Sequence, residues 1–467
     1  MTAVLALLPV VLLVTGAGLV LPPDRRRGAA LVAATVLTTS ASSLSVPATV
    51  RHAVVAAAVA VLGAAVLTPR RWPSGPHGIV VTVLVTSAAT VTCVLVLAPS
   101  TIVLAAELAA LAVLVTLATA TASSADRRLF LRGLVAWGCA EAVLGVVEAF
   151  VTHRPLPWGY KVLSTGRSFV SPNRVLPGGL DRVEGTLGHP IPFAVLLAVC
   201  LVVVLLAPRG TFSRRVVVVA VPVLGVGVLL SGSRSVLLAL LVAAVHGVLT
   251  ADTARRAAVV VVSGLAVVVG AVLLGQAIVE GVGVLVASGS WENRWGALES
   301  VPLLFTRPLV EVLVGSGFGS EPELYARGLL PQTGFTTVDN QLVTTFATVG
   351  LLGVAGLVAL FVVGFRTAGR AGRGVVLVMA VALFYFDYFA WFSMVVLLHA
   401  GLALDDETAR RRDLPADGLA EAPRAVRSLA PGRPTHVDVD VHADRVPGTG
   451  VLVSTRLSAG GSVTPDA

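Results

Sequence analysis

Long apolar runs alternate with short polar segments along most of the chain. A helix needs about 20 mostly apolar residues to cross the hydrocarbon core of a bilayer. Runs near that length lie at about 3–22, 28–46, 52–68, 79–98, 101–122, 129–151, 188–207, 216–231, 234–250, 257–279 and 340–364, with a longer run at 374–404. The pattern predicts an all-α polytopic integral membrane protein with about 12–13 transmembrane helices.

Two of these runs need interpretation. The run 374–404 is too long for one ordinary span and contains Asp387 within FYFDYFAWF, so we expect two short helices at about 374–386 and 390–404. The run 3–22 has no positive charge before it and arginines after it, which predicts a retained span instead of a cleaved signal peptide.

Charged residues make up only 13% of the chain, against about 25% in soluble domains, and hydrophobic residues make up 56%. The formal net charge of +8 does not indicate a nucleic-acid partner, because most arginines fall in short loops between apolar runs. The arginines in those loops are Arg25 to Arg27, Arg70, Arg71, Arg127, Arg128, Arg209, Arg214, Arg215, Arg255, Arg256, Arg366, Arg370 and Arg373.

If every run crosses the membrane, these arginines share one side, which the positive-inside rule makes cytoplasmic. Two long loops, 152–187 and 280–339, then face away from the cytoplasm, and chemistry is expected there. The segment 405–467 is rich in Pro, Asp, Arg and Gly without apolar periodicity, which predicts a disordered cytoplasmic tail. The predicted location is the cytoplasmic membrane, with the active site on its outer side.

The three cysteines, Cys93, Cys139 and Cys200, all lie inside apolar runs. Their spacing gives neither a disulfide framework nor a set of metal ligands. We therefore expect no metal at these cysteines and interpret the thiols as small buried apolar groups. No nucleotide-binding motif is found in the sequence, and no cofactor is expected.

Arginine is frequent in and beside the two outer loops. A guanidinium is permanently charged and presents a planar fork of donors that fits a phosphate. A group of arginines there would suit a lipid-linked pyrophosphate. The competing explanation is that long loops carry arginines for solubility and for contact with lipid headgroups. The outer arginines are Arg154, Arg167, Arg174, Arg182, Arg234, Arg294, Arg307 and Arg327.

An Asp339-Asn340 pair stands where a polar stub meets the apolar run in TTVDNQLVTTFATVGLLGVAG. Asp is a favoured N-cap residue, so Asp339 could simply cap a membrane helix. Alternatively the pair could carry chemistry at the membrane surface, with the Asp339 carboxylate as a proton acceptor. The GSGFGS stretch at 315–320 is similar to a phosphate-binding loop but ends in Ser320, and we expect a flexible turn there.

Four blocks of sequence, in order, resemble the O-antigen ligase and polysaccharide polymerase superfamily. They are DRVEGTLGHPIPFAVLL (181–197), LLSGSRSVLLALL (229–241), ENRWGALESVPLLFTRPLVEVLVGSGFGS (292–320) and VDNQLVTTFATVGLLG (338–353). The resemblance covers 129–404 and implies a membrane core with the external loops 152–187 and 280–339, preceded by N-terminal membrane helices at 1–128.

The resemblance implies an integral membrane glycosyltransferase that works without a metal. Its partners would be a glycan on an undecaprenyl-pyrophosphate carrier, a saccharide or lipid acceptor, membrane lipids and other proteins of a polysaccharide assembly system. Carried onto this chain, it makes Arg182, Arg234 and Arg294 the pyrophosphate-binding residues and places Asp339 and Asn340 at the acceptor-activating position.

The chain departs from the ligase pattern, since ligases typically have His-Asn where Asp339 and Asn340 stand, and this looks more like the polymerase side. His189 and Glu148 are further candidates for the proton acceptor, and each has a structural explanation as well. Ligase and polymerase both stay open, as does a different class, a multi-spanning transporter or lipid-glycan flippase. A structural partner in an envelope assembly is the third alternative.

Overall fold

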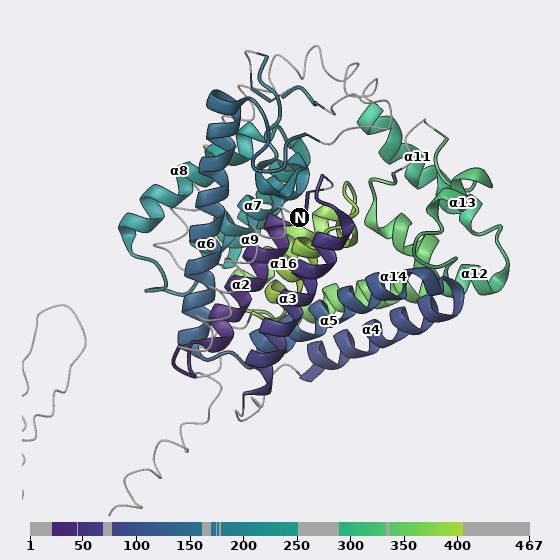
Figure 1. The fold of residues 1–467 in the computed structure, drawn as a ribbon, viewed down its shortest axis with the longest axis horizontal. Coiled ribbons are helices and arrows are strands. Elements are labelled where there is room, and N and C mark those ends of the chain that lie inside the picture. The colour runs from purple at the N-terminus through teal and green to yellow at the C-terminus, as the bar shows by residue number, and fades with distance from the viewer. Residues whose placement is uncertain are drawn as a thin grey trace, which may run out of the picture. The chain divides into compact units, whose positions relative to one another are not determined.

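The structure is a computed structural model that describes residues 21–43, 45–68, 77–160, 170–173, 175–176, 179–250, 289–332 and 337–404 (Figure 1). Over these residues the chain is helical and contains no β-strand, only an isolated bridge between Pro172 and Asp181. The predicted runs at 3–22 and 257–279 and the predicted tail 405–467 lie outside the described residues.

The predicted runs that the structure describes all form helices. The first part of the chain folds into α2 (Arg26–Ser40), α3 (Ala48–Leu67), α4 (His77–Leu97), α5 (Ile102–Ala120) and α6 (Ser124–Val147), which continues as a π-helical turn, Glu148–Thr152. The next helices are α7 (Pro190–Leu206), α8 (Arg214–Leu230) and α9 (Arg234–Thr250). The last are α14 (Gln341–Thr367), α15 (Arg370–Ala382) and α16 (Phe392–Ala403).

Five of the described helical stretches are long and apolar enough to cross a membrane. They are Ala48–Leu67, Gly78–Leu97, Pro99–Ala120, Ser124–Thr152 and Gln341–Thr367. Three shorter apolar helices, α7, α9 and α16, accompany them. The all-helical fold class is confirmed for the described residues, and the chain is a helical protein with several helices suited to a membrane.

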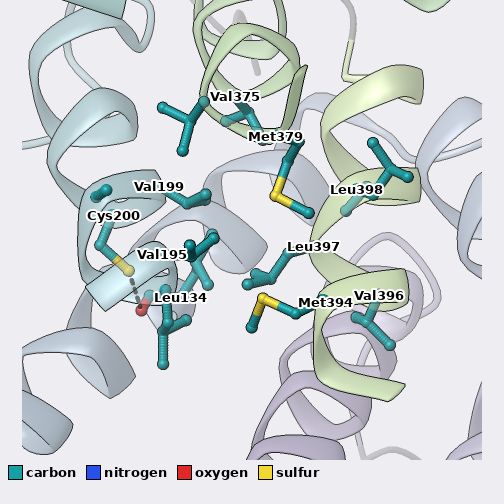
Figure 2. Close-up of a cluster of buried hydrophobic side chains, with 14 of the residues drawn as sticks. Leu134, Val195, Val199, Cys200, Val375, Met379, Met394, Val396, Leu397 and Leu398 are labelled. Carbon is teal, nitrogen blue, oxygen red and sulfur yellow. Dashed lines mark hydrogen bonds between the residues drawn. The ribbon is translucent and has the colours of Figure 1, made fainter. Parts of the chain in front are cut away.

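Helix α7 is buried along almost its whole length, which explains why its sequence is apolar on every face. It packs against α6, α8, α9 and α15, and its side chains meet those of α15 and α16 in the cluster of Figure 2. Cys200 lies there, fully buried, with its Sγ 3.4 Å from the carbonyl oxygen of Leu134. Its thiol is free and serves as a small core group.

The predicted division of 374–404 into two helices is confirmed. Helices α15 and α16 form an antiparallel hairpin, because the backbone N–H of Gly369 before α15 donates to the carbonyl oxygen of Leu404 after α16, at 2.8 Å. The linking residues, 383–391, are called here the aromatic turn; they include a 3-10 turn at Tyr388–Ala390. Asp387 lies in this turn.

The segment predicted as the external loop 280–339 contains further helices. They are α11 (Gly289–Leu304), α12 (Leu309–Val314) and α13 (Glu321–Ala326). They pack on the first half of α14 through a second apolar core that is separate from the main one, and Ala297, Leu304, Leu324 and Phe346 belong to it. A run of short helices with little apolar periodicity gives no clear sequence signal, so the segment was predicted only as a loop.

Helix α14 is broken at Gly350, whose φ of 72° and ψ of −168° are not helical. A side chain there would clash with the carbonyl oxygen of Leu313, 2.4 Å from the ideal Cβ position, and only glycine adopts this backbone freely. The break frees backbone carbonyls of the preceding turn. The GSGFGS stretch takes up two of them: the N–H groups of Ser316 and Gly317 donate to Ala347 and Thr348, both at 2.9 Å.

Arg307 also donates hydrogen bonds to carbonyls at this break. It is 5% exposed and donates from Nη1 to the oxygen of Ala347 at 2.8 Å and from Nη2 to that of Phe346 at 3.0 Å. Its guanidinium also lies over the Phe346 ring, 5.2 Å from the centroid. The GSGFGS stretch is therefore a turn whose backbone N–H groups bind the carbonyls of a broken helix.

Candidate functional site

Arg182 is bound to the turn between α8 and α9. Its backbone N–H donates to the oxygen of Ser171 at 2.9 Å, beside the bridge between Pro172 and Asp181. Its side chain donates from Nε to the oxygen of Ser231 at 2.8 Å and from Nη2 to the hydroxyl of Ser233 at 2.9 Å. These contacts leave Nη1 without a hydrogen bond among the described residues.

Arg234 is the first residue of α9, directly after the turn that Arg182 holds. The turn is tight: Gly232 has a φ of 62°, and a Cβ there would come within 2.8 Å of the Asn173 Oδ1. Asn173 also donates from Nδ2 to the oxygens of Leu229 and Leu230, at 3.1 and 2.8 Å. The segment that carries Asn173 and Arg182 is thus bound to the turn at 229–233, which brings Arg182 and Arg234 close together.

Glu148 anchors the chain just after Arg182. Its carboxylate accepts hydrogen bonds from the backbone N–H groups of Glu184, at 3.0 and 3.2 Å, and of Gly185, at 2.9 Å. Glu141, in α6, accepts hydrogen bonds from the N–H and the hydroxyl of Thr186. Both carboxylates are buried. Glu148 therefore has a positioning role in this structure, because its oxygens are occupied by the backbone that carries Arg182.

Glu184 is buried next to Arg182. Burial raises the pKa of its carboxyl to about 8, repulsion from Glu148 adds to the rise, and Arg182 opposes it. A carboxyl with that pKa is mostly neutral at pH 7, so Glu184 does not cancel the positive charge of the arginine.

Arg294 comes from α11, outside the part of the chain that holds Arg182 and Arg234. Its guanidinium carbon lies 5.8 Å from the centroid of the Tyr385 ring. Its Nε is buried and has no hydrogen-bond partner in the described part of the chain. Burial lowers the pKa of Arg294; Asp339 and Tyr385 oppose this and Arg234 adds to it.

The three arginines predicted to bind pyrophosphate lie within electrostatic reach of one another. Burial lowers the pKa of Arg182 to about 10, and the charges of Arg294 and Arg234 lower it further, against Glu184 and Asp339. We call Arg182, Arg234 and Arg294 the arginine cluster. Cations held together and partly withdrawn from water favour the binding of an anion, which relieves their mutual repulsion.

Asn340 is the N-cap of α14. Its Oδ1 accepts from the N–H groups of Leu342 and Val343, at 3.0 and 3.2 Å, and the residue is 1% exposed. The alternative in which Asp339 caps the helix is therefore wrong, because Asn340 performs that role one residue later. Asp339 precedes the cap, and its charge reaches both Arg182 and Arg294.

His189 is the N-cap of α7, its Nδ1 accepting from the N–H of Ile191 at 3.3 Å. Its ring packs on Phe386 and Trp391, with centroids 6.1 and 5.6 Å apart. Both aromatic residues belong to the aromatic turn, so His189 links that turn to the chain that follows Arg182. Like Glu148, it has a structural explanation.

Gln341 fixes the aromatic turn to the start of α14. Its backbone N–H donates to the oxygen of Leu383 at 2.8 Å, and its Oε1 accepts from the N–H of Phe389 at 2.9 Å. The residue is 1% exposed. Sequence reasoning missed this role; the signal was a glutamine at the start of an otherwise apolar run.

Asp387, in the aromatic turn, is an acidic residue near Asp339 and Glu321. Burial raises the pKa of this carboxyl to about 7, and the charges of Glu321 and Asp339 raise it further. Its Oδ1 is buried without a hydrogen-bond partner in the described part of the chain. Sequence reasoning noted Asp387 as unusual but did not join it to Asp339, because nothing local connects residues so far apart.

Two further arginines of the predicted outer loops have other partners. Arg307 supports the break in α14, and Arg327 pairs with Glu311 at 3.3 Å and with Glu323 at 3.8 Å. Arg167 and Arg174 fall outside the described residues. Within the described ranges, no group of three or more His, Cys, Asp or Glu side chains is arranged to hold a metal ion.

A groove lies beside the site at the depth of the helices. It encloses about 720 Å³, open space included, between α4, α5, α14 and α16. Its lining runs along one face of α14, from Gln341 through Thr345, Gly353 and Gly356 to Leu360. The wall is mainly apolar, and at the N-terminal end of α14 the groove reaches Gln341, the residue after Asn340.

Comparison with models of known protein families and with curated proteins found no match for this chain.

Proposed function

We propose that the protein is a membrane-embedded glycosyltransferase of the O-antigen ligase and polysaccharide polymerase type. It would take a glycan from an undecaprenyl-pyrophosphate carrier and pass it to a saccharide or lipid acceptor on the outer face of the cytoplasmic membrane. The single observation that carries the proposal is the arginine cluster, because residues chosen from sequence for one ligand come from three separate parts of the chain and influence one another electrostatically.

The proposed topology has about 12–13 membrane spans, with 152–187 and 280–339 on the outer side. Arg182 and Asn173 come from the first of these segments, and Arg294 and Asp339 from the second. The arginine distribution in the short loops supports this orientation through the positive-inside rule. The arginine cluster and the carboxylates then meet at the outer boundary, where both the carrier headgroup and an acceptor are within reach.

The proposed reaction displaces a pyrophosphate from a sugar. The acceptor hydroxyl oxygen attacks the anomeric carbon, the bond between that carbon and the pyrophosphate oxygen breaks, and the electron pair leaves with undecaprenyl pyrophosphate. Arg182, Arg234 and Arg294 would stabilise the negative charge that develops on the leaving group. Guanidinium groups suit this role because they stay protonated and can donate two parallel hydrogen bonds to phosphate oxygens.

The proton of the acceptor hydroxyl would pass to the Asp339 carboxylate. The Asp339 carboxylate acts electrostatically on both Arg182 and Arg294, so the proposed proton acceptor belongs to the same site as the arginine cluster. Asn340 would act by fixing the start of α14, and with it Asp339, since its side-chain oxygen already accepts two backbone hydrogen bonds. Glu148 and His189 would hold the segment that follows Arg182.

The groove between α4, α5, α14 and α16 supports a lipid substrate. It is mainly apolar, it follows α14 from Gln341 to Leu360, and Gln341 also binds the aromatic turn beside the site. A long isoprenoid chain lying there would leave its headgroup near Asp339 and the arginine cluster.

One observation favours the alternative, a transporter or lipid-glycan flippase. Broken membrane helices are common at the binding sites of transporters, and α14 is broken at Gly350. In transporters the freed backbone groups bind substrate or ions. Here Arg307 and the GSGFGS stretch already take up the carbonyls of Phe346, Ala347 and Thr348. The glycosyltransferase proposal accounts for the arginine cluster as well, and we prefer it.

The proposal is tested by changing Arg294 to Ala and to Lys in cells that make the polymer. Loss of the guanidinium should abolish polymer and cause lipid-linked repeat units to accumulate, at normal protein level. Arg294→Lys should restore the function only in part, because an ammonium keeps the charge but loses the planar fork. The surface variant Arg327→Lys is the matched control. Normal polymer in Arg294→Ala would refute the proposed role of the cluster.

A further inference from the structure

Two neighbouring side chains at the edge of the arginine cluster each carry a buried hydrogen-bonding group without a partner in the described part of the chain. The groups are the Nε of Arg294 and the hydroxyl of Tyr385, and within the described ranges neither has a hydrogen-bond partner. A buried polar group left unsatisfied destabilises the folded state, so such groups in a native structure need an explanation. Two such groups on neighbouring side chains point to a ligand-binding site.

The side chains of Arg294 and Tyr385 are close in space. The guanidinium carbon of Arg294 is 5.8 Å from the centroid of the Tyr385 ring, and the ring is 4% exposed. The arginine thus packs over the ring face, and the hydroxyl lies within its electrostatic field.

Tyr385 has little freedom to find another partner. It lies in the aromatic turn, which Gln341 binds on both sides through Leu383 and Phe389, at 2.8 and 2.9 Å. The next residue, Phe386, packs on the ring of His189. A side chain held in this way keeps its hydroxyl at one place, as a preorganised binding group does.

We propose that Tyr385 is a binding residue for the anion of the arginine cluster, its hydroxyl donating a hydrogen bond to the same phosphoryl group that Arg294 binds. This rests on the proposed function and extends it. An arginine can only donate hydrogen bonds, and a phenol can donate one, so an oxygen that only accepts satisfies both groups. Phosphoryl oxygens have this property, and Arg182 and Arg234 supply the further positive charge that such a group needs.

The chain offers a matched control in the same turn. Tyr388 is fully buried, and its hydroxyl also lacks a partner in the described part of the chain. Its charged neighbour is the carboxyl of Asp387, with no arginine acting on it. Removal of either hydroxyl should leave the fold intact, because neither makes an internal hydrogen bond in the described structure. A binding defect confined to Tyr385→Phe would therefore not be explained by lost packing.

The experiment is a titration of the purified full-length chain, in phosphatidylcholine nanodiscs, with farnesyl pyrophosphate. Tyr385→Phe should weaken the affinity by about tenfold, which is typical of one hydrogen bond to a charged group. Tyr388→Phe should bind like the unsubstituted protein. Equal affinity of Tyr385→Phe and the unsubstituted protein would overturn the inference.

Two further outcomes distinguish a failure of the role of Tyr385 from a failure of the proposed function. If Arg294→Ala loses binding while Tyr385→Phe does not, only the role of Tyr385 fails. If Arg294→Ala also binds normally, the proposed function fails with it. A third arm repeats the titration with phosphatidylglycerol in the nanodiscs. Competition from that lipid in the unsubstituted protein, absent in Tyr385→Phe, would assign the site to a phospholipid phosphate and overturn the assignment to a pyrophosphate.

Discussion

The Nε of Arg182 donates a 2.8 Å hydrogen bond to the backbone oxygen of Ser231. Because Arg234 follows three residues later, this single contact ties one arginine of the cluster to the turn that carries another. Arg294 then arrives from α11, and the site forms only when α11 packs beside the start of α14. Most predictions below separate residues that carry the proposed chemistry from residues that hold this arrangement together.

Asp339 and Asn340 should respond differently to substitution. Asn340→Ala should lower stability by about 0.5–2 kcal/mol, because it removes the N-cap of α14, whereas Asn340→Asp should keep the cap. Asp339→Asn should leave thermal unfolding in detergent nearly unchanged and abolish polymer. Normal polymer in Asp339→Asn would exclude it as the proton acceptor and make Asp387 the next candidate, since its carboxyl lies within the field of Asp339.

Glu184 should make the protein less stable as the pH rises. Its pKa is raised from 4.5 to about 8, so the folded state binds this proton more tightly than the unfolded state does. The resulting stabilisation is fully present below pH 4.5 and is lost as the pH rises toward 8. Glu184→Gln should flatten this dependence and raise the unfolding temperature at pH 8.5 by a few degrees.

Thermal unfolding of Glu184→Gln in detergent between pH 5.5 and 8.5 checks this, with Glu323→Gln as an exposed control. A Glu184→Gln variant with the same pH slope as the unsubstituted protein would show that this carboxyl is not held in its neutral form.

Arg307 should matter for stability and Arg327 should not. Arg307→Ala removes the hydrogen bonds to the carbonyls of Phe346 and Ala347, although Ala347 keeps the one from the N–H of Ser316; the loss of these bonds from a charged donor should cost about 2 kcal/mol. Arg327 makes exposed ion pairs, worth about 0–1 kcal/mol. Thermal unfolding of both variants in detergent is the measurement. Equal effects would mean that Arg307 is not needed to satisfy the broken helix.

The topology should be visible with single cysteines on intact cells. Cysteines introduced at Ser171 and Ala326 should react with an impermeant maleimide, because they belong to the outer segments. A cysteine at Ala416 should react only after the cells are opened, since the tail is predicted to be cytoplasmic. Outside labelling at Ala416 would change the number of spans before the tail.

Local patterns were sufficient to predict most helices, because a run such as 129–151 or 340–364 is both apolar and near membrane length. The same reasoning could not predict the break at Gly350, since a glycine within an apolar helix is common and the break depends on contact with Leu313. The boundary of α14 was also ambiguous by one residue. Asp339 and Asn340 are equally good caps, and tertiary packing through Gln341 decides between them.

In the candidate site, too, some residues could be predicted from local sequence and others depend on tertiary contacts. The arginines could be chosen from sequence because guanidinium chemistry and the resemblance agreed, and the structure brings Arg182, Arg234 and Arg294 together. Tyr385 and Asp387 could not be assigned to the site, because their relevance depends on the turn between α15 and α16 reaching α11 and α14. Glu148 and His189 were chosen for their chemistry, and their hydrogen bonds to backbone give them positioning roles.

The most direct test of the central claim is transfer by the purified chain in proteoliposomes, supplied with an undecaprenyl-pyrophosphate-linked repeat unit and no nucleotide sugar. We expect longer glycan chains or a glycosylated acceptor, together with release of undecaprenyl pyrophosphate, and we expect Arg294→Ala to give neither. Movement of the intact lipid-linked unit across the membrane, with no new glycosidic bond and no released carrier, would contradict the proposal and favour a flippase.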